Sequence, residues 1–219
     1  MSKQWKNMTF PIPTPIYHIT HIDNLDSILK SGGLLSHNQK VQQCIQHRNI
    51  AHGNIQERRS VTVVPCGSGG TLHDYVPFFF APKPPMLYPV RNNRVAGYTD
   101  GQDPIVYFVA HAQNVANANS SFVFTDGHAT MTLSDFYCDL NELSKVDWDV
   151  MSMTYWNDTP DFPDRKRRRQ AEFLVRDFLP WSQVDQIVVL NQERCQQVLK
   201  MTLNVSHKPV VSIKPDWYY

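Results

Sequence analysis

The chain has 219 residues, and 21 lysines and arginines balance 20 aspartates and glutamates to leave a formal net charge of +1. This length suits one domain over residues 1–219 with a substantial hydrophobic core. The balanced charge excludes a global field that would draw the protein onto nucleic acid, so any such binding must come from local patches.

The cysteines and the absence of long apolar runs indicate the compartment. Cys44, Cys66, Cys138 and Cys195 are far apart without zinc-ligand spacing, which predicts free thiols in a reducing cytoplasm and no structural metal. No apolar run approaches the roughly 20 residues that span a bilayer. Residues 1–15 also lack the apolar centre of a signal peptide.

The first part of the chain is expected to form a strand, a helix and a lid. Residues 16–20 have the composition of a short strand, and residues 23–31 are predicted to be a capped helix. The polar segment 38–59 is predicted to be a helical, mobile lid, followed by a strand or extended arm at 60–65. The glycine-rich residues 66–70 lack the ending of a phosphate-binding loop and are predicted to be a connection.

The middle of the chain alternates apolar segments with turns. Residues 75–80 are apolar throughout and are predicted to form a central strand. Four prolines over 81–89 argue against a regular helix there. A buried strand at 104–109, a short helix at 112–119 and a strand at 121–124 are expected to follow.

The last part contains a long irregular segment before the final elements. Residues 133–143 are predicted to be an amphipathic helix, whereas residues 148–169 show no sustained period and are rich in aromatic and basic side chains. Structureless stretches of this length are uncommon unless they bind something, so a functional loop is expected. The remaining predictions are strands around Glu172, at 185–190 and at 210–214, and a helix at 193–201.

Glu172 is the most unusual position, because it is a lone acid in an apolar strand that follows the five cations 165–169. Glutamate is disfavoured in strands, so its carboxylate must either face solvent or occupy a pocket with a partner. Taken alone, the strand favours the solvated position. His18, which shares a strand face with Thr20, is likewise more typical of a structural residue than of a ligand contact.

Six blocks of sequence resemble the DarT family of DNA ADP-ribosyltransferase toxins. They occur in the family's order, and the resemblance extends to the terminal segment 216–219, so that it covers nearly the whole chain. The order of the blocks, more than any single block, makes the resemblance specific. The blocks are residues 15–25, 55–59, 72–78, 85–88, 122–126 and 170–175.

This resemblance implies an α/β fold of the ADP-ribosyltransferase type, in which a split central β-sheet with flanking helices forms a cleft for NAD. Members of the family transfer ADP-ribose from NAD to a base of single-stranded DNA and release nicotinamide, which blocks DNA replication. A macrodomain antitoxin of the DarG type removes the mark. The acceptor is thymidine in the larger branch and guanosine in another, so the base stays open.

The resemblance also implies roles for individual residues. Arg59 and Glu172 match the catalytic residues, segment 38–59 matches the part that covers NAD, and segment 128–172 matches the loop that shapes the DNA site. The expected NAD contacts are His18, Ile19, Thr20, Ser27, Leu35 and Arg59. Expected DNA contacts are Met86, Tyr88 and His128 by resemblance, and Tyr155, Trp156, Arg167, Arg168 and Arg169 by their place in the aromatic, basic loop.

The chemistry of these residue types fits those roles. An ionised Glu172 would offset the positive charge that develops on the ribose as nicotinamide leaves. Arg59 carries a permanent charge, so it is suited to stabilising an anionic base and poorly suited to removing a proton. Two other functions stay open: an ADP-ribosyltransferase acting on RNA or protein, and a non-catalytic domain that binds single-stranded nucleic acid.

Overall fold

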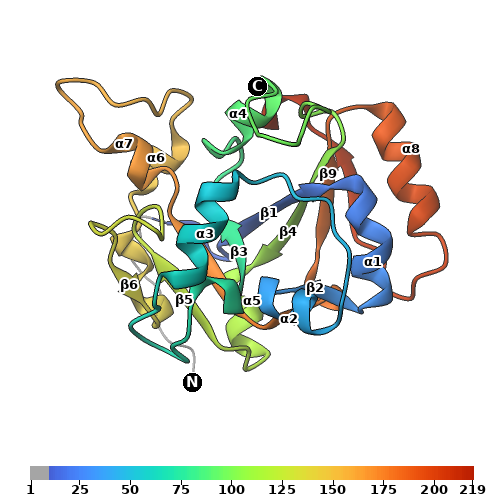
Figure 1. Ribbon diagram of the computed structural model, residues 1–219, viewed down its shortest axis with the longest axis horizontal. Helices are drawn as coiled ribbons and strands as arrows, with labels where there is room; N and C mark the ends of the chain where they lie inside the picture. The colour runs from blue at the N-terminus through green and yellow to red at the C-terminus, as the bar shows by residue number, and fades with distance from the viewer. Residues whose placement is uncertain (1–9) are drawn as a thin grey trace.

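A large mixed β-sheet runs through the computed structural model, which describes residues 10–219 (Figure 1). Its strands are β1 (Pro15–His21), β3 (Tyr75–Phe79), β4 (Ile105–His111), β5 (Phe122–Thr125), β6 (Phe136–Tyr137), β7 (Glu172–Arg176), β9 (Gln186–Val189) and β10 (Val210–Ile213). They follow the order β10-β9-β4-β1-β3-β7-β5-β6, with β10 and β9 parallel and the other neighbours antiparallel. The predicted α/β class is confirmed.

Short helices surround the sheet. They are α1 (Leu25–Lys30), α2 (His37–Gln42), α3 (Gly53–Val61), α4 (Leu87–Arg91), α5 (Ala112–Asn117), α6 (Trp148–Ser152), α7 (Arg165–Arg168) and α8 (Gln192–Met201). Figure 1 shows α1 and α8 at one end of the molecule and α6, α7 and β6 at the other. Five short 3-10 helices are η1 (Ile22–Asn24), η2 (Leu72–Asp74), η3 (Leu140–Lys145), η4 (Trp181–Gln183) and η5 (Pro215–Trp217).

The sheet splits between β1 and β3, which pair only at Tyr17 and Phe79. Two residues before Phe79 in β3, Pro77 lacks the N–H group that would continue the ladder. Its carbonyl instead accepts a hydrogen bond from the imidazole Nδ1 of His18 at 2.8 Å. The two strands therefore diverge, and the predicted split central sheet is confirmed.

β4 shows how the core is built on both faces of this sheet. Its first six residues are buried, which explains why they form a continuous apolar run. Alternate residues join different clusters: Val106 and Phe108 pack in the larger one, whereas Tyr107 and Val109 pack in the second. Burying each such side chain contributes about 1.5–3 kcal/mol.

A second, two-stranded sheet joins β2 (Gly33–Leu35) to β8 (Phe178–Pro180), and neither strand was predicted. The two strands approach closely at Gly33, where an added Cβ atom would lie 2.1 Å from the backbone oxygen of Leu179. Glycine is the residue that permits this contact. A strand therefore begins at Gly33, shortly after the segment 23–31 that was predicted to be a helix.

The predicted helix over 133–143 is wrong. Its first part forms β6, in which Tyr137 stacks on Phe124 with ring centroids 5.2 Å apart. Asp139 then adopts an extended backbone and accepts the N–H of Asn141, which starts the 3-10 helix η3. The side-chain bond of the aspartate offers the backbone an alternative to the α-helix that the apolar spacing favoured.

Two other boundaries differ from expectation. The strand or extended arm predicted at 60–65 begins later than expected because α3 continues to Val61, and only an isolated bridge then joins Val63 to Thr71. The proline-rich segment 81–89 does enter a helix, since α4 begins at Leu87. Proline is tolerated in the first turn of a helix, where the backbone N–H has no partner within the helix.

Candidate functional site

A cleft of about 480 Å³ lies where β1 and β3 separate. β1, β3 and the start of β7 form one side, and α2, α3 and the segment between them form the other. The cleft brings together eleven of the predicted site residues: His18, Ile19, Thr20, Ser27, Leu35, Arg59, Met86, Tyr88, His128, Trp156 and Glu172. The other four, Tyr155, Arg167, Arg168 and Arg169, do not line it.

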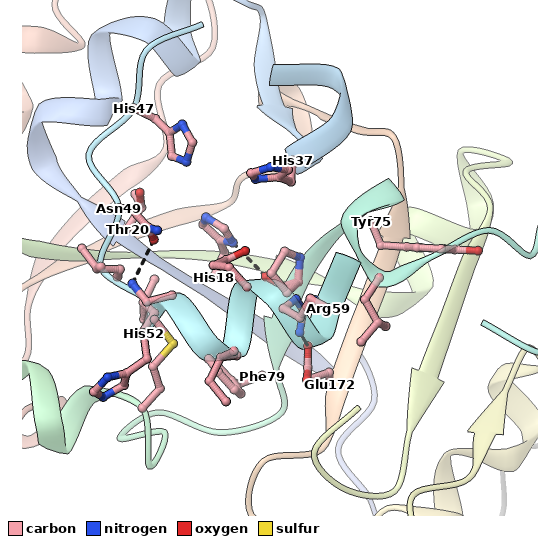
Figure 2. A pocket seen from close by; sticks show the side chains of 18 of the residues that line it. His18, Thr20, His37, His47, Asn49, His52, Arg59, Tyr75, Phe79 and Glu172 are labelled. Carbon is pink, nitrogen blue, oxygen red and sulfur yellow. Dashed lines mark hydrogen bonds and ion pairs between the residues drawn. The ribbon is translucent and has the colours of Figure 1, made fainter. Parts of the chain in front are cut away.

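Arg59 and Glu172 form a buried ion pair in this cleft (Figure 2). Arg59 Nη1 donates to Glu172 Oε2 at 2.7 Å, and the two side chains are only 10% and 4% exposed. They come from α3 and from the first residue of β7, which are far apart in sequence. The solvated position that the strand alone favoured for Glu172 is therefore wrong.

Further contacts hold both the carboxylate and the backbone of Glu172 in place. Its Oε1 accepts the backbone N–H of Ala129 at 3.2 Å. Its own N–H donates to Thr125 Oγ1 at 3.1 Å, and the residue pairs with Phe79 across β3. Each carboxylate oxygen retains a second acceptor position, so the group can still receive a hydroxyl from a ligand.

Arg59 retains an unused donor. Its Nη2 is buried and has no hydrogen-bond partner among residues 10–219. A buried donor without a partner costs about 1–3 kcal/mol. A ligand oxygen in the cleft would remove that cost, so the arginine is prepared for a second acceptor besides Glu172.

His18 is a neutral acceptor at the sheet split. Burial lowers its pKa to about 4, although the bond to Pro77 opposes that shift. Because a carbonyl can only accept, Nδ1 carries the proton and Nε2 has a free lone pair. The ring is parallel to that of Phe108, with centroids 6.2 Å apart, which fixes its orientation.

His128 has the opposite tautomer. Its Nδ1 accepts the backbone N–H of Thr130 at 3.2 Å, so in the neutral ring Nε2 carries the proton. Burial lowers the pKa of His128, and the nearby Glu172 only partly opposes this. The cleft therefore contains one imidazole that accepts and another that donates at neutral pH.

The covering segment 38–59 consists of α2, an extended stretch and α3. Asn24 holds the stretch against the body of the protein, since its side chain donates to Arg48 O at 2.9 Å and accepts Arg48 N–H at 2.7 Å. At the other end, Asn38 donates to Asp74 Oδ1 at 2.7 Å. Polar bonds therefore attach this segment near both ends, and between them Ile50 is buried in the second hydrophobic cluster.

The basic run differs from expectation, because three of its cations have internal partners. Arg167 pairs with Asp164 and Asp126 at 2.8 and 3.1 Å, and Arg168 pairs with Asp147. Arg169 is 5% exposed and its guanidinium donates to three backbone carbonyls, those of Val150, Met151 and Pro82. These contacts make the three arginines unsuitable as the main phosphate contacts that the sequence suggested.

The other two cations of the run remain available. The guanidinium of Arg165 lies 4.1 Å from the ring centroid of Phe162, which is 55% exposed. Lys166 lines the cleft, and no side-chain partner for it is found within residues 10–219. Both residues belong to the region that projects from the molecule around α7 in Figure 1.

Aromatic side chains also line this cleft, among them Tyr88 and Trp156. Trp156 donates its indole N–H to Tyr219 Oη at 2.8 Å, and Tyr88 packs edge-on against Tyr219 with centroids 5.4 Å apart. Tyr88 is 43% exposed and Tyr155 is 82% exposed, so both are accessible. The C-terminal Tyr219 was not among the predicted site residues.

Several cleft residues were missed by sequence reasoning. They are polar side chains of the covering segment and its neighbour η2: His37, Lys40, His47, Asn49, His52, Gln56 and His73. The available signal was the density of histidine in a segment already expected to cover NAD. Among the described residues, no three potential ligands gather as a metal site.

No helix in the described part of the chain is long and apolar enough to cross a membrane. All four cysteines are free: Cys44 and Cys138 are exposed, and Cys195 is buried.

Comparison with known proteins places these features in a family. The family model described as the single-stranded-DNA thymidine ADP-ribosyltransferase DarT matches residues 17–219. A DNA ADP-ribosyl transferase from Thermus sp. strain 2.9 is 45% identical over 213 residues, which are 96% of this chain and 99% of that protein. A fusion of a DNA ADP-ribosyl transferase with a DNA ADP-ribosyl glycohydrolase from Thermosipho africanus is 26% identical over 92% of this chain and 49% of its own length.

Two solved structures of Thermus sp. 2.9 DarT are also similar. The complex with ADP-ribosylated single-stranded DNA has a TM-score of 0.91 and 44% identity, and the match covers 97% of this chain and 99% of that chain. The complex with NAD+ has a TM-score of 0.87 and 42% identity, with 96% and 100% covered.

Proposed function

The chain belongs to the DarT family of single-stranded-DNA thymidine ADP-ribosyltransferases, and we propose that it transfers ADP-ribose from NAD to thymidine in single-stranded DNA. The buried pair of Arg59 and Glu172 in the cleft at the sheet split is the observation that carries this proposal. We assign catalysis to these two residues and NAD binding to the wall formed by His18, Ile19, Thr20, Ser27 and Leu35.

Breaking the bond from the ribose anomeric carbon to nicotinamide is the first demand on the site. Nicotinamide leaves as a neutral molecule with the electron pair of that bond, and positive charge develops on the ribose. The Glu172 carboxylate is held by Arg59 and Ala129 and can accept a ribose hydroxyl while offsetting this charge. Because its position is fixed before reaction, little reorganisation is needed.

Attack by a thymine ring nitrogen on the anomeric carbon completes the transfer. The base must lose the proton of that nitrogen, and negative charge spreads to its carbonyl oxygens. The free Nη2 of Arg59 and the Nε2–H of His128 are donors for those oxygens. Glu172 is the acceptor for the proton, since its charge is no longer needed once the new bond forms.

The DNA strand is proposed to cross the side of the cleft formed by the loop 128–172. Met86, Tyr88 and Trp156 would contact or stack on bases, and stacking contributes about 1–3 kcal/mol per base. Arg165 and Lys166 replace the internally paired arginines as the phosphate contacts. A paired base presents neither a free edge nor an exposed face, so duplex DNA should be a poor substrate.

We further propose that the protein is a cytoplasmic toxin opposed by a macrodomain glycohydrolase of the DarG type. The Thermosipho africanus relative joins a transferase and a glycohydrolase in one chain, which supports such a partner. The free cysteines and the need for both NAD and DNA support the cytoplasm. Residues 1–219 would act as one domain.

Labelled NAD tests the function directly. The protein is incubated with NAD labelled in the adenylate group and with single-stranded DNA, RNA and a protein mixture, separately and together. Label should enter only the DNA, and Glu172→Gln should abolish the transfer. Label that enters RNA or protein instead, or that is independent of Glu172, would contradict the proposal.

A further inference from the structure

One corner of the cleft contains a cation without a counter-charge. Lys40 lies on α2, lines the cleft and is partly buried. Burial lowers its pKa from 10.5 to about 8, so the ammonium group is still largely protonated at neutral pH. Burying a charge without a partner is costly, and folded proteins rarely retain one unless a ligand or a counter-ion uses it.

The carboxylates around the cleft do not supply that counter-charge. No ion pair of Lys40 is found within residues 10–219. Each neighbouring acid has another partner: Glu172 pairs with Arg59, Asp74 accepts from Asn38 and Thr71, and Asp23 and Asp100 pair with Arg48. The cation of Lys40 is therefore left for a group that is not part of the protein.

The side chains closest to this corner are imidazoles. The ring of His37 lies 4.0 Å from that of His73 and 6.2 Å from that of His47, measured between centroids, and His37 and His47 lie together in Figure 2. Burial lowers the pKa of His47 and of His73 to about 4 and lowers that of His37 as well. Neutral imidazoles can donate hydrogen bonds to an anion, while Lys40 supplies the positive charge.

We propose that Lys40 binds the diphosphate of NAD, with His37 and His47 as neutral hydrogen-bond donors beside it. The diphosphate is the anionic part of NAD, and a lysine ammonium is a well-suited point charge for phosphate oxygens. Lys40 would thus fix the middle of the dinucleotide while Arg59 and Glu172 act on the ribose. This inference rests on the proposed use of NAD.

Ligands with and without a diphosphate separate this role from a structural one. Binding of NAD, ADP and adenosine is measured by calorimetry for the wild type, Lys40→Gln and Lys40→Arg. Lys40→Gln should weaken NAD and ADP by about ten- to a hundredfold, the range for losing a hydrogen bond to a charged group. It should leave adenosine unchanged and should not lower the melting temperature, whereas Lys40→Arg should retain most of the affinity.

The pH dependence of NAD binding gives an independent readout. His18 on β1, His37 on α2, His47 on the extended stretch and His73 on η2 are neutral above pH 7, and Arg59 on α3 is paired with Glu172. Lys40 therefore is the group facing this corner that titrates near pH 8. Wild-type affinity for NAD should fall as pH rises through 8, and that of Lys40→Arg should stay level.

The outcomes distinguish this inference from the proposed function. Equal NAD and ADP affinities in the wild type and Lys40→Gln would overturn the role of Lys40 while leaving NAD binding in place. An identical fall with pH in Lys40→Arg would also overturn it. Failure of the wild type to bind NAD at all would instead contradict the proposed function itself.

Discussion

At the scale of single residues, the site depends on a few polar atoms whose partners are fixed before any ligand binds. Both oxygens of Glu172 accept a hydrogen bond from the protein, and Arg59 has one donor in use and one free. This arrangement is suited to stabilising charge that appears only during reaction. Substitutions that remove one of these groups at a time test its contribution.

Glu172→Gln keeps the size of the side chain and removes its charge. The transfer rate should fall by about two orders of magnitude or more, as is typical when an electrostatic contact to the transition state is lost. The amide has a single acceptor oxygen, so it can keep only one of the two bonds from Arg59 and Ala129, and the melting temperature should fall modestly while the variant stays folded. Single-turnover transfer to labelled DNA measures the effect, and near-normal turnover would refute the assignment.

Arg59→Lys keeps a positive charge and loses the planar guanidinium group. A lysine can pair with Glu172 but cannot at the same time direct a second nitrogen to the acceptor, so transfer should be severely reduced in a folded protein. Arg58→Lys is the matched control, since Arg58 is exposed on the same helix and should retain activity. The reverse pattern would show that the two arginines have been assigned in the wrong order.

His18 predicts a pH dependence of stability. Its pKa is about 4 in the folded protein and 6.5 when unfolded, so below pH 6.5 the unfolded chain binds a proton that the folded one does not. The stability that the folded protein has while His18 is neutral is complete above pH 6.5 and is lost as pH falls towards 4. The loss amounts to about 3 kcal/mol for a shift of this size.

Urea unfolding at several pH values measures this. His18→Gln lacks the titrating group, so its free energy of unfolding should fall less steeply between pH 6.5 and 4 than that of the wild type. His47 and His73 titrate in both proteins and cancel in the comparison. Parallel curves for the two proteins would contradict the depressed pKa of His18.

At the scale of elements, the run 165–169 shows why charge in a sequence does not locate a binding surface. Four of its five cations form the short helix α7 and Arg169 follows it, and three of the five side chains meet acids or carbonyls. Arg169 joins α6, the proline-rich segment and the start of β7, which makes it a structural link. No local pattern distinguishes these arginines from Arg165 and Lys166.

Salt dependence distinguishes the two groups of cations. Arg165→Ala combined with Lys166→Ala should reduce the slope of log affinity against log salt by about 1.4, at roughly 0.7 per phosphate contact of a single strand. Arg169→Ala should instead lower the free energy of unfolding by about 2–3 kcal/mol, because carbonyls lose their donor. An unchanged slope in the double variant would exclude this surface from DNA binding.

The elements that the sequence predicted correctly are those whose signal is local. The first six residues of β4 and the three central residues of β7 are apolar because both faces are buried, and the ends of β4 were predicted within about two residues. The segment 133–143 was mispredicted because Asp139 caps a 3-10 helix where the apolar spacing favoured an α-helix. β2 and β8 are three residues each, too short for any periodicity to reveal.

At the scale of the whole molecule, the site is made by contacts that sequence spacing alone does not specify. Arg59 and Glu172 are 113 positions apart and were paired by family resemblance, while the residues themselves only marked Glu172 as unusual. Lys40 and the imidazoles around it were missed, because their burial depends on how the covering segment folds onto the cleft. The split of the sheet at Pro77 is likewise visible only in the structure.

The central claim is that this cleft modifies thymidine in single strands. The most direct measurement uses a pool of single-stranded oligonucleotides with one thymidine between randomised adenine and cytosine flanks, incubated with NAD and analysed by mass spectrometry. We expect one ADP-ribose on the thymidine-containing fragment, little on the same pool annealed to its complement, and none with Glu172→Gln. Modification of a thymidine-free pool, or of the duplex as fast as the single strand, would contradict it.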